Sequence, residues 1–384
     1  MTTVVVAGAI ANKYRHGGSA WVRTSWAEGL RELGFDVVLV EQLDAAACTD
    51  ARGAACSFET APATAHFARV AAEFGFAGRS ALIAPDGTRT AGLGLEELND
   101  LIAGADLLVN LGGHLRPGDL TRGIPMRVYV DLDPGYTQIW LADGHDLGIE
   151  DHHLHFTVGV NVGTPSSPLP AGGVRWRPIR QPVVLDRWPV SDDAFTSCTT
   201  IASWRGAFGR VEWDGRLYGQ KAHEFRRLAD LPRRAGVPCE VVLDVHAQDA
   251  SDAARLRDGG WTVADPQLVE TTAAFSAYVR GSGAEISPAQ GVYVGARTGW
   301  FSDRTVRYLA SGRPAVVQDT GLGASLPTGE GLVTFTTPEQ AAAGLRAVFE
   351  DHARHADAAR AIAEQHFAHP RALAPLLDAA GVAP

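Results

Sequence analysis

The chain has 384 residues, which is long for one domain and typical of two. Apolar residues make up 46% of the chain and charged residues 20%, as in globular proteins that bury a sizeable core. The formal net charge is −10 and no run of five basic residues occurs, so we expect neither nucleic acid nor a membrane surface as a partner.

The cysteines and the amino terminus indicate the compartment. The four cysteines, which form no CxxC motif, are Cys48, Cys56, Cys198 and Cys239. Such sparse cysteines suit a reducing cytoplasm. The first apolar run is short and lacks a positively charged leading segment, and no stretch reaches the length of a transmembrane helix. We therefore predict a cytoplasmic protein without membrane insertion.

Strands and helices alternate along the first half. Residues 3–7 form a β-branched run that ends at Gly8, which predicts a buried strand. A loop follows, and residues 19–33 place apolar side chains on one helical face before Gly34. Residues 35–42 predict the next strand, so the order is that of a doubly wound α/β domain. Further strands are predicted at 106–113, 127–133 and 155–163.

A second α/β pattern follows a proline-rich segment. Six prolines fall within residues 164–189, which predicts a linker between domains. Beyond it, residues 219–236 have a helical pattern. The predicted strands are 199–204, 238–245, 291–296, 313–319 and 331–335. Thr337, Pro338 and Gln340 predict a helix start, and helical sequence continues to about Leu377 with a break at Pro370.

A short segment in the second half has the pattern of an anion site. Ser302 or Asp303 is predicted to cap a helix that begins near Arg304, and the first-turn amides would then face the preceding loop. Gly299 lets the backbone approach a ligand, and Arg304 offers two parallel N–H donors to phosphate oxygens. The alternative is a purely structural helix cap.

The segment 299–321, with its "LASGRP" and "QDTG" sequences, resembles the donor-binding signature of GT-B glycosyltransferases. The resemblance implies two Rossmann-like α/β domains that face a cleft. It divides the chain into an acceptor-binding domain at 1–180, a donor-binding domain at 181–365, and a helix at 366–384 that returns to the first domain. It also implies a metal-independent hexosyltransferase that needs no cofactor beyond its nucleotide diphosphate sugar, and a hydroxyl or amine acceptor.

The same resemblance assigns the donor site. The residues that it places around the donor phosphates are Gly17, Gly18, Arg205, Lys221, Gly299, Ser302, Asp303, Arg304, Gln318, Asp319 and Thr320. Asp265 and Gln267 correspond to a short element near the base. For Lys221, a solvated helix position remains an equal alternative. Many relatives carry a glutamate that grips the ribose where this chain has Arg307, so the base stays open.

Three residues are candidates for the catalytic group. Asp133 ends a predicted strand and could contact an acceptor or orient a base, or it could only cap the turn that follows. His16 lies in the Gly-Gly loop, where inverting members of the fold often place a base, and His114 ends another strand. Either histidine could instead be a surface or hydrogen-bonded residue. The spacing of His152, His153 and His155 matches no metal motif, so no metal site is predicted.

Alternative functions remain open. A nucleotide-sugar epimerase on the same fold would need no acceptor, and a non-catalytic protein would bind the nucleotide sugar without turnover. A dinucleotide oxidoreductase is disfavoured, because the first strand is not followed by GxGxxG. The sequence does not indicate the sugar, the acceptor, the stereochemical outcome or the oligomeric state.

Overall fold

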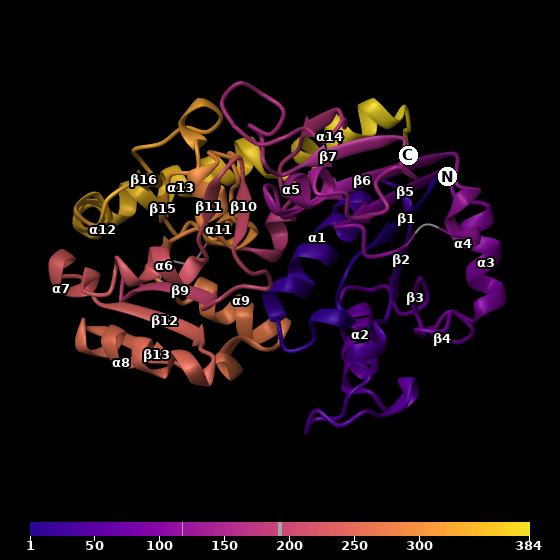
Figure 1. Cartoon of the computed structure of the whole chain (residues 1–384), viewed down its shortest axis with the longest axis horizontal. Coiled ribbons are helices and arrows are strands. Elements are labelled where there is room, and N and C mark those ends of the chain that lie inside the picture. Colours follow the sequence, from indigo (N-terminus) through magenta and orange to yellow (C-terminus); the bar gives the residue numbers. More distant parts are fainter. Residues whose placement is uncertain (117, 191–193) are drawn as a thin grey trace.

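Two α/β domains lie side by side in the computed structural model, which describes residues 1–116, 118–190 and 194–384 (Figure 1). The first domain is drawn from indigo to magenta, the second from pink to orange, and the carboxyl-terminal helices in yellow run along both. Each domain is built on its own sheet, and a two-stranded hairpin, β10 (Val211–Trp213) and β11 (Arg216–Tyr218), belongs to the second domain.

The first sheet has the strand order β4-β3-β2-β1-β5-β6-β7-β8, and all neighbours are parallel except β3 and β4. Its strands are β1 (Thr3–Ala7), β2 (Asp36–Gln42), β3 (Ser80–Ile83), β4 (Thr90–Gly92), β5 (Leu107–Leu111), β6 (Met126–Asp131), β7 (Leu154–Thr157) and β8 (Trp176–Pro178). The helices are the 3-10 helix η1 (Ala11–Lys13), α1 (Gly17–Glu32), α2 (Pro62–Glu73), α3 (Leu95–Ala103), α4 (Asp119–Arg122) and α5 (Tyr136–Ala142). The apolar residues of β1 are fully buried, as expected for a parallel sheet covered on both faces.

The second sheet is parallel throughout, in the order β13-β12-β9-β14-β15-β16. Its strands are β9 (Cys198–Ser203), β12 (Cys239–Asp244), β13 (Trp261–Ala264), β14 (Ala284–Ser287), β15 (Ala315–Gln318) and β16 (Leu332–Phe335). The helices are α6 (Lys221–Arg226), α7 (Leu231–Ala235), α8 (Ala250–Asp258), the 3-10 helix η6 (Pro266–Val269), α9 (Thr272–Arg280), α10 (Gly291–Gly295), α11 (Asp303–Ala310) and α12 (Pro338–Glu350). Short 3-10 helices elsewhere in the chain are Ala45–Ala47, Phe58–Thr60, Leu185–Arg187, Ala247–Asp249 and Leu322–Ala324.

The carboxyl-terminal helices tie the domains together. α13 (His352–His366) packs against α11, and α14 (His369–Ala380) returns to the first domain and packs against α1. Backbone hydrogen bonds join Val183 to Phe367 and His369 at 2.9 and 3.0 Å. This confirms the predicted architecture of two Rossmann-like domains with a helix that crosses back. The predicted boundaries at residues 180 and 365 stay a prediction, although the two sheets end and begin at Pro178 and Cys198.

The domains meet where two glycines open helix α1. A Cβ on Gly17 would lie 2.3 Å from the carbonyl oxygen of Thr271, and one on Gly18 would lie 2.7 Å from the ring of Phe275. Nearby, the Trp21 indole donates to the carbonyl of Thr272 at 2.9 Å. The Gly-Gly pair is therefore required for the close approach of the second domain, besides any role toward a ligand.

Arg307 spans the same interface. Its guanidinium is fully buried and donates to the Trp21 carbonyl and the Ser25 hydroxyl of α1, both at 3.0 Å, and to the Asp303 carbonyl at 2.8 Å. The residue at the position of the expected ribose glutamate thus connects α11 to the first domain.

Several predicted elements differ from the observed ones. Residues 291–296 were expected as a strand, but form helix α10, and the helix predicted at 219–236 is split into α6 and α7 by the turn before Pro232. Residues 155–163 form a strand only as far as Thr157, and the proline-rich segment contributes β8 to the first sheet. The break predicted at Pro370 lies just before it, because proline is tolerated in the first turn of α14.

Replacing Gly17 tests the interface. Gly17→Ala should lower the free energy of unfolding by about 1–3 kcal/mol, because the added methyl group overpacks against the Thr271 backbone. Gly94→Ala is the matched control, since a Cβ there meets nothing within 4 Å. Calorimetry that finds equal melting temperatures for the two variants would contradict this close approach.

Candidate functional site

A cavity of about 590 Å³ lies between the domains. One wall comes from the loop after β1, residues 14–19, together with Asp133 after β6. The opposite wall comes from the carboxyl ends of β9 and β12, from Lys221 at the start of α6, and from residues 302–304 at the start of α11. Carboxyl ends of parallel strands are where α/β folds bind ligands, so the cavity occupies the expected place.

The start of α11 is open toward the cavity. Ser302 occupies the N-cap position, but its side chain makes no capping hydrogen bond, and neither does that of Asp303. The predicted side-chain cap is therefore wrong. The missing side-chain cap favours ligand binding at the start of α11, because the first-turn amides keep their hydrogen-bonding capacity and the positive end of the helix dipole faces the cavity.

Arg304 is not the free phosphate-binding fork that the sequence suggested. Its Nε donates to Glu285 at 2.6 Å, Nη1 to the Ile201 carbonyl at 2.6 Å and Nη2 to the Ser287 hydroxyl at 2.9 Å. Glu285 is fully buried, so the guanidinium serves as the counter-ion of a carboxylate below the cavity. Arg304 still borders the cavity and contributes positive charge there.

Lys221 lies in the wall of the cavity, and its contact with a phosphate stays a prediction. The residue is half-buried and lines the cavity, and its ammonium group makes no hydrogen bond or ion pair with any described residue. Burial and the nearby Arg304 lower the pKa of its ammonium group to about 8. A cation with no partner in a cavity indicates that the partner is a ligand.

Lys13 was missed in the sequence. Of 34 basic residues only two are lysines, Lys13 and Lys221. Lys13 ends η1 directly before the cavity loop, and its charge acts on Asp133 and His114. The rarity of lysine was the signal that could have singled out this residue.

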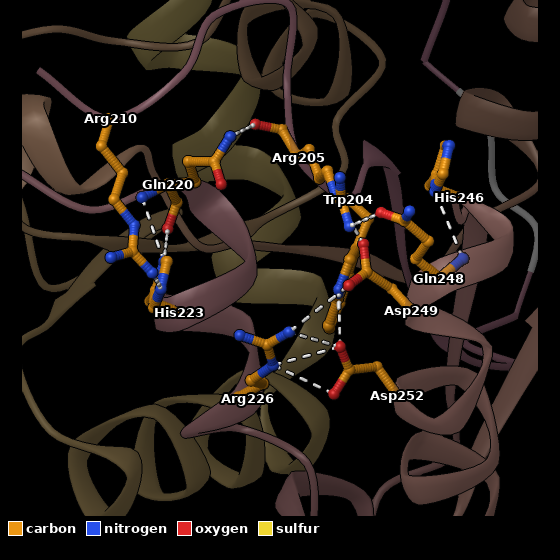
Figure 2. A network of polar contacts seen from close by, with 10 residues as sticks. All are labelled: Trp204, Arg205, Arg210, Gln220, His223, Arg226, His246, Gln248, Asp249 and Asp252. Carbon is orange, nitrogen blue, oxygen red and sulfur yellow. Dashed lines mark hydrogen bonds and ion pairs between the residues drawn. The ribbon is translucent and has the colours of Figure 1, made fainter.

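Arg205 lies outside the cavity and belongs to a surface network (Figure 2). Its Nε donates to Asp249 at 2.6 Å, and Arg226 pairs with Asp252 at 2.6 Å. The Trp204 indole also donates to Asp252, at 2.9 Å. The predicted phosphate contact of Arg205 is therefore not supported by its orientation.

Four other predicted donor residues support loops instead of lining the cavity. Gly299, at φ 70°, faces the first domain, where a Cβ would lie 2.6 Å from Val160. Gln318 donates to Glu224 at 2.7 Å. Asp319 accepts from two backbone amides, the closer at 2.8 Å, and the Thr320 hydroxyl donates to the Trp300 carbonyl at 2.6 Å.

The predicted base-proximal segment reaches the cavity through other residues. Asp265 and Gln267 are exposed, and the Asp265 carboxylate accepts from the Gln267 amide at 2.8 Å, which caps η6. The cavity is instead lined by their neighbours Pro266, Val269 and Glu270. The segment therefore borders the cavity, but not through the two predicted side chains, and its proximity to a base stays a prediction.

The two aspartates after β6 have different surroundings. Asp131 is buried and accepts hydrogen bonds from Thr137, Gln138 and Thr157, so it is structural. Asp133 lines the cavity and accepts from the Tyr293 hydroxyl of the second domain at 3.1 Å, rather than capping the turn. Burial and the neighbouring Asp131 raise the pKa of Asp133 to about 6.

The two candidate histidines, His16 and His114, also have different surroundings. His16 lines the cavity and is open to it. The cavity walls partly desolvate its imidazole, and this desolvation, together with the charge of Lys13, lowers the pKa of His16. His114 does not line the cavity, and burial, with Arg23, lowers its pKa to about 3, which makes it a poor base.

The histidines at 152, 153 and 155 hydrogen-bond to separate groups. Among the described residues no group of three or more metal-ligating side chains is found.

Comparison with solved structures identifies the fold. HepE of Anabaena in complex with UDP-glucose superposes over 99% of this chain and all of its own, with a TM-score of 0.61 and 13% identity. An alpha-glucosyltransferase in complex with UDP-glucose and DNA gives 0.57 and 11%, over 99% of both chains. AviGT4, a glycosyltransferase involved in avilamycin A biosynthesis, gives 0.56 and 12%, over 99% of this chain and 97% of its own.

The chain has the GT-B fold. No protein-family model matches its sequence, and no curated protein is significantly similar to it. None of the described helices combines the length and the apolar composition needed to cross a membrane.

Replacing Arg304 and replacing Arg205 should have very different effects on the free energy of unfolding. Arg304→Ala should lower the free energy of unfolding by about 3–5 kcal/mol, because it leaves Glu285 buried without its counter-ion. Arg205→Ala should change stability little, since the Arg205 side chain is 42% exposed and Asp249 keeps Arg226 within 3.9 Å. Urea denaturation that finds Arg304→Ala as stable as Arg205→Ala would contradict these roles.

Proposed function

We propose that the protein is a glycosyltransferase that moves a sugar from a nucleotide diphosphate sugar to a hydroxyl or amine group of a small acceptor. One observation carries the proposal: the cavity brings an open helix start, and a lysine ammonium group without a partner among the described residues, opposite a carboxylate of the other domain. These are the groups that bind a diphosphate and activate a nucleophile. The solved structures that share the fold support it, since several contain UDP or UDP-glucose.

The diphosphate would lie on the first turn of α11. Lys221 and Arg304 are close enough to influence each other's charge, and the carboxylates that act on both are Asp303 and Glu285. Backbone amides, the helix dipole and the Lys221 ammonium together favour a bound phosphate. When the sugar–phosphate bond breaks, the leaving diphosphate gains charge, so these fixed donors stabilise the transition state more than the bound substrate.

Asp133 is the best-placed base. The hydrogen bond from Tyr293 occupies Oδ1, while the carboxylate faces the cavity. In the proposed step the carboxylate takes the proton of the acceptor group, whose oxygen or nitrogen bonds to the anomeric carbon. The bond from that carbon to the phosphate oxygen breaks, and its electron pair stays with the diphosphate. His16, across the cavity loop, is the second candidate for the proton.

Charge balance would not require a metal ion in this scheme, because protein cations and amides already face the phosphate position. We further propose a small-molecule acceptor. The alpha-glucosyltransferase of the same fold was solved with DNA, whereas the net charge of −10 here disfavours a polyanion. Location in the cytoplasm remains a prediction from the sequence.

A thermal-shift panel of UDP, GDP, TDP and ADP tests the donor site. A nucleotide at a hundred times its Kd should stabilise the protein by about 2.7 kcal/mol. Lys221→Met should lose most of that shift, and Arg205→Met should keep it, because Arg205 lies outside the cavity. If no nucleotide raises the melting temperature, or if Lys221→Met responds like the wild type, the phosphate assignment is wrong. Conversion of a donor sugar without any acceptor would indicate an epimerase instead.

The pH profile tests the two charged groups. Asp133 acts as a base only when ionised, so kcat/KM should rise through a pKa of about 6. Lys221 binds phosphate only when protonated, so kcat/KM should fall through a pKa of about 8. Asp133→Asn should abolish the acidic limb together with most of the activity. An Asp133→Asn enzyme of normal rate would exclude this residue as the base.

A further inference from the structure

The cavity also contains a carboxylate suited to the nucleoside part of a donor. This inference rests on the proposed function. If the diphosphate lies at the start of α11, the base must lie farther along the cavity. Val242 of β12 and Pro266 and Val269 of η6 line the cavity and offer a base an apolar surface. The ribose, which joins base and phosphates, then passes the carboxyl ends of β9 and β12.

Asp244 lies at the carboxyl end of β12, beside the expected path of the ribose. It is the last residue of β12, is exposed to the cavity, and makes no side-chain hydrogen bond or ion pair with any described residue. β12 pairs with β9, the first strand of the domain, so Asp244 ends the second strand of a Rossmann-like unit. In dinucleotide-binding Rossmann domains an acid associated with this part of the fold accepts hydrogen bonds from ribose hydroxyls.

We propose that Asp244 binds the ribose hydroxyls of the donor nucleotide and makes the protein selective for ribonucleotides over deoxyribonucleotides. A carboxylate accepts from two adjacent hydroxyls at once, and such charged hydrogen bonds are stronger than neutral ones. A 2′-deoxy nucleotide removes one donor and leaves part of the carboxylate unsatisfied.

The other nearby residues are less suited to this contact. Arg307 is buried against α1 and does not line the cavity. Asp303 lies at the helix start, where the phosphates would be. Glu270 lines the cavity, but it lies between Val269 and Thr271, whose carbonyls pack within 3 Å of the Cβ position of Gly17. Glu270 is thus at the seam between the domains.

The test compares UDP, ADP and GDP, each with its 2′-deoxy form, by calorimetric titration of the full-length protein. For the nucleotide that binds, the wild type should prefer the ribose form by about 10-fold or more, the loss expected for one hydrogen bond to a charged group. Asp244→Asn should reduce that preference to near unity. Glu270→Gln should retain it. Asp258→Asn, an exposed acid at the end of α8, is the remote control and should also retain it.

The outcomes distinguish failure of the proposed donor site from failure of the Asp244 assignment alone. If none of the diphosphates binds, the proposed donor site fails, and this inference fails with it. If a ribonucleotide binds but Asp244→Asn keeps the wild-type preference, or if Glu270→Gln loses it instead, Asp244 does not read the ribose while the donor site stands. Equal affinity of the wild type for both forms would also overturn the inference.

Discussion

The buried guanidinium of Arg307 is the interaction on which the cleft depends. It places the start of α11 against α1 by donating to the Trp21 carbonyl and the Ser25 hydroxyl. It has no carboxylate partner among the described residues, and burial lowers its pKa to about 10, which still leaves it charged at neutral pH. The two terminal nitrogens of this buried cation donate only to neutral oxygens, and its Nε has no hydrogen-bond partner among the described residues. Displacing the guanidinium would cost it the hydrogen bonds that it does make, which opposes movement of α11 away from α1. The glycines that open α1 permit this geometry, and the cavity forms beside it.

The basic residues in the cleft and beside it fall into two groups with different tasks. Arg304 and Arg205 are paired with Glu285 and Asp249, and they organise the protein itself. The ammonium groups of Lys221 and Lys13 have no hydrogen-bond or ion-pair partner among the described residues. Arginine suits fixed bidentate pairs, whereas lysine is a compact charge whose pKa shifts when it is buried. The chain has only two lysines, and one of them lines the cavity while the other directly precedes the cavity loop, as expected if a ligand supplies the counter-charge.

The fold could be predicted further than the site. Strands such as β1 and β12 were located because buried parallel strands read as apolar β-branched runs with clear ends. Helix α10 was missed because its Val292 and Val294 favour a strand locally, and tertiary packing decided otherwise. The orientation of Arg304 and Arg205 could not be predicted, because their carboxylate partners lie 19 and 44 residues away in the chain. Sequence indicates which residues come near a ligand, but it does not show which of them are already bound to one another.

In the proposed complex, the Lys221 ammonium group contacts the diphosphate of a nucleotide sugar. Because the chain has only two lysines, the protein labelled with lysine carbon-13 at Cε should give two assignable NMR signals, and Lys13→Arg identifies which is which. The Lys221 signal should titrate with a pKa of about 8 in the free protein, and a saturating nucleotide diphosphate should move this pKa upward. A nucleotide that binds to saturation and leaves the Lys221 signal and its pKa unchanged would contradict the account.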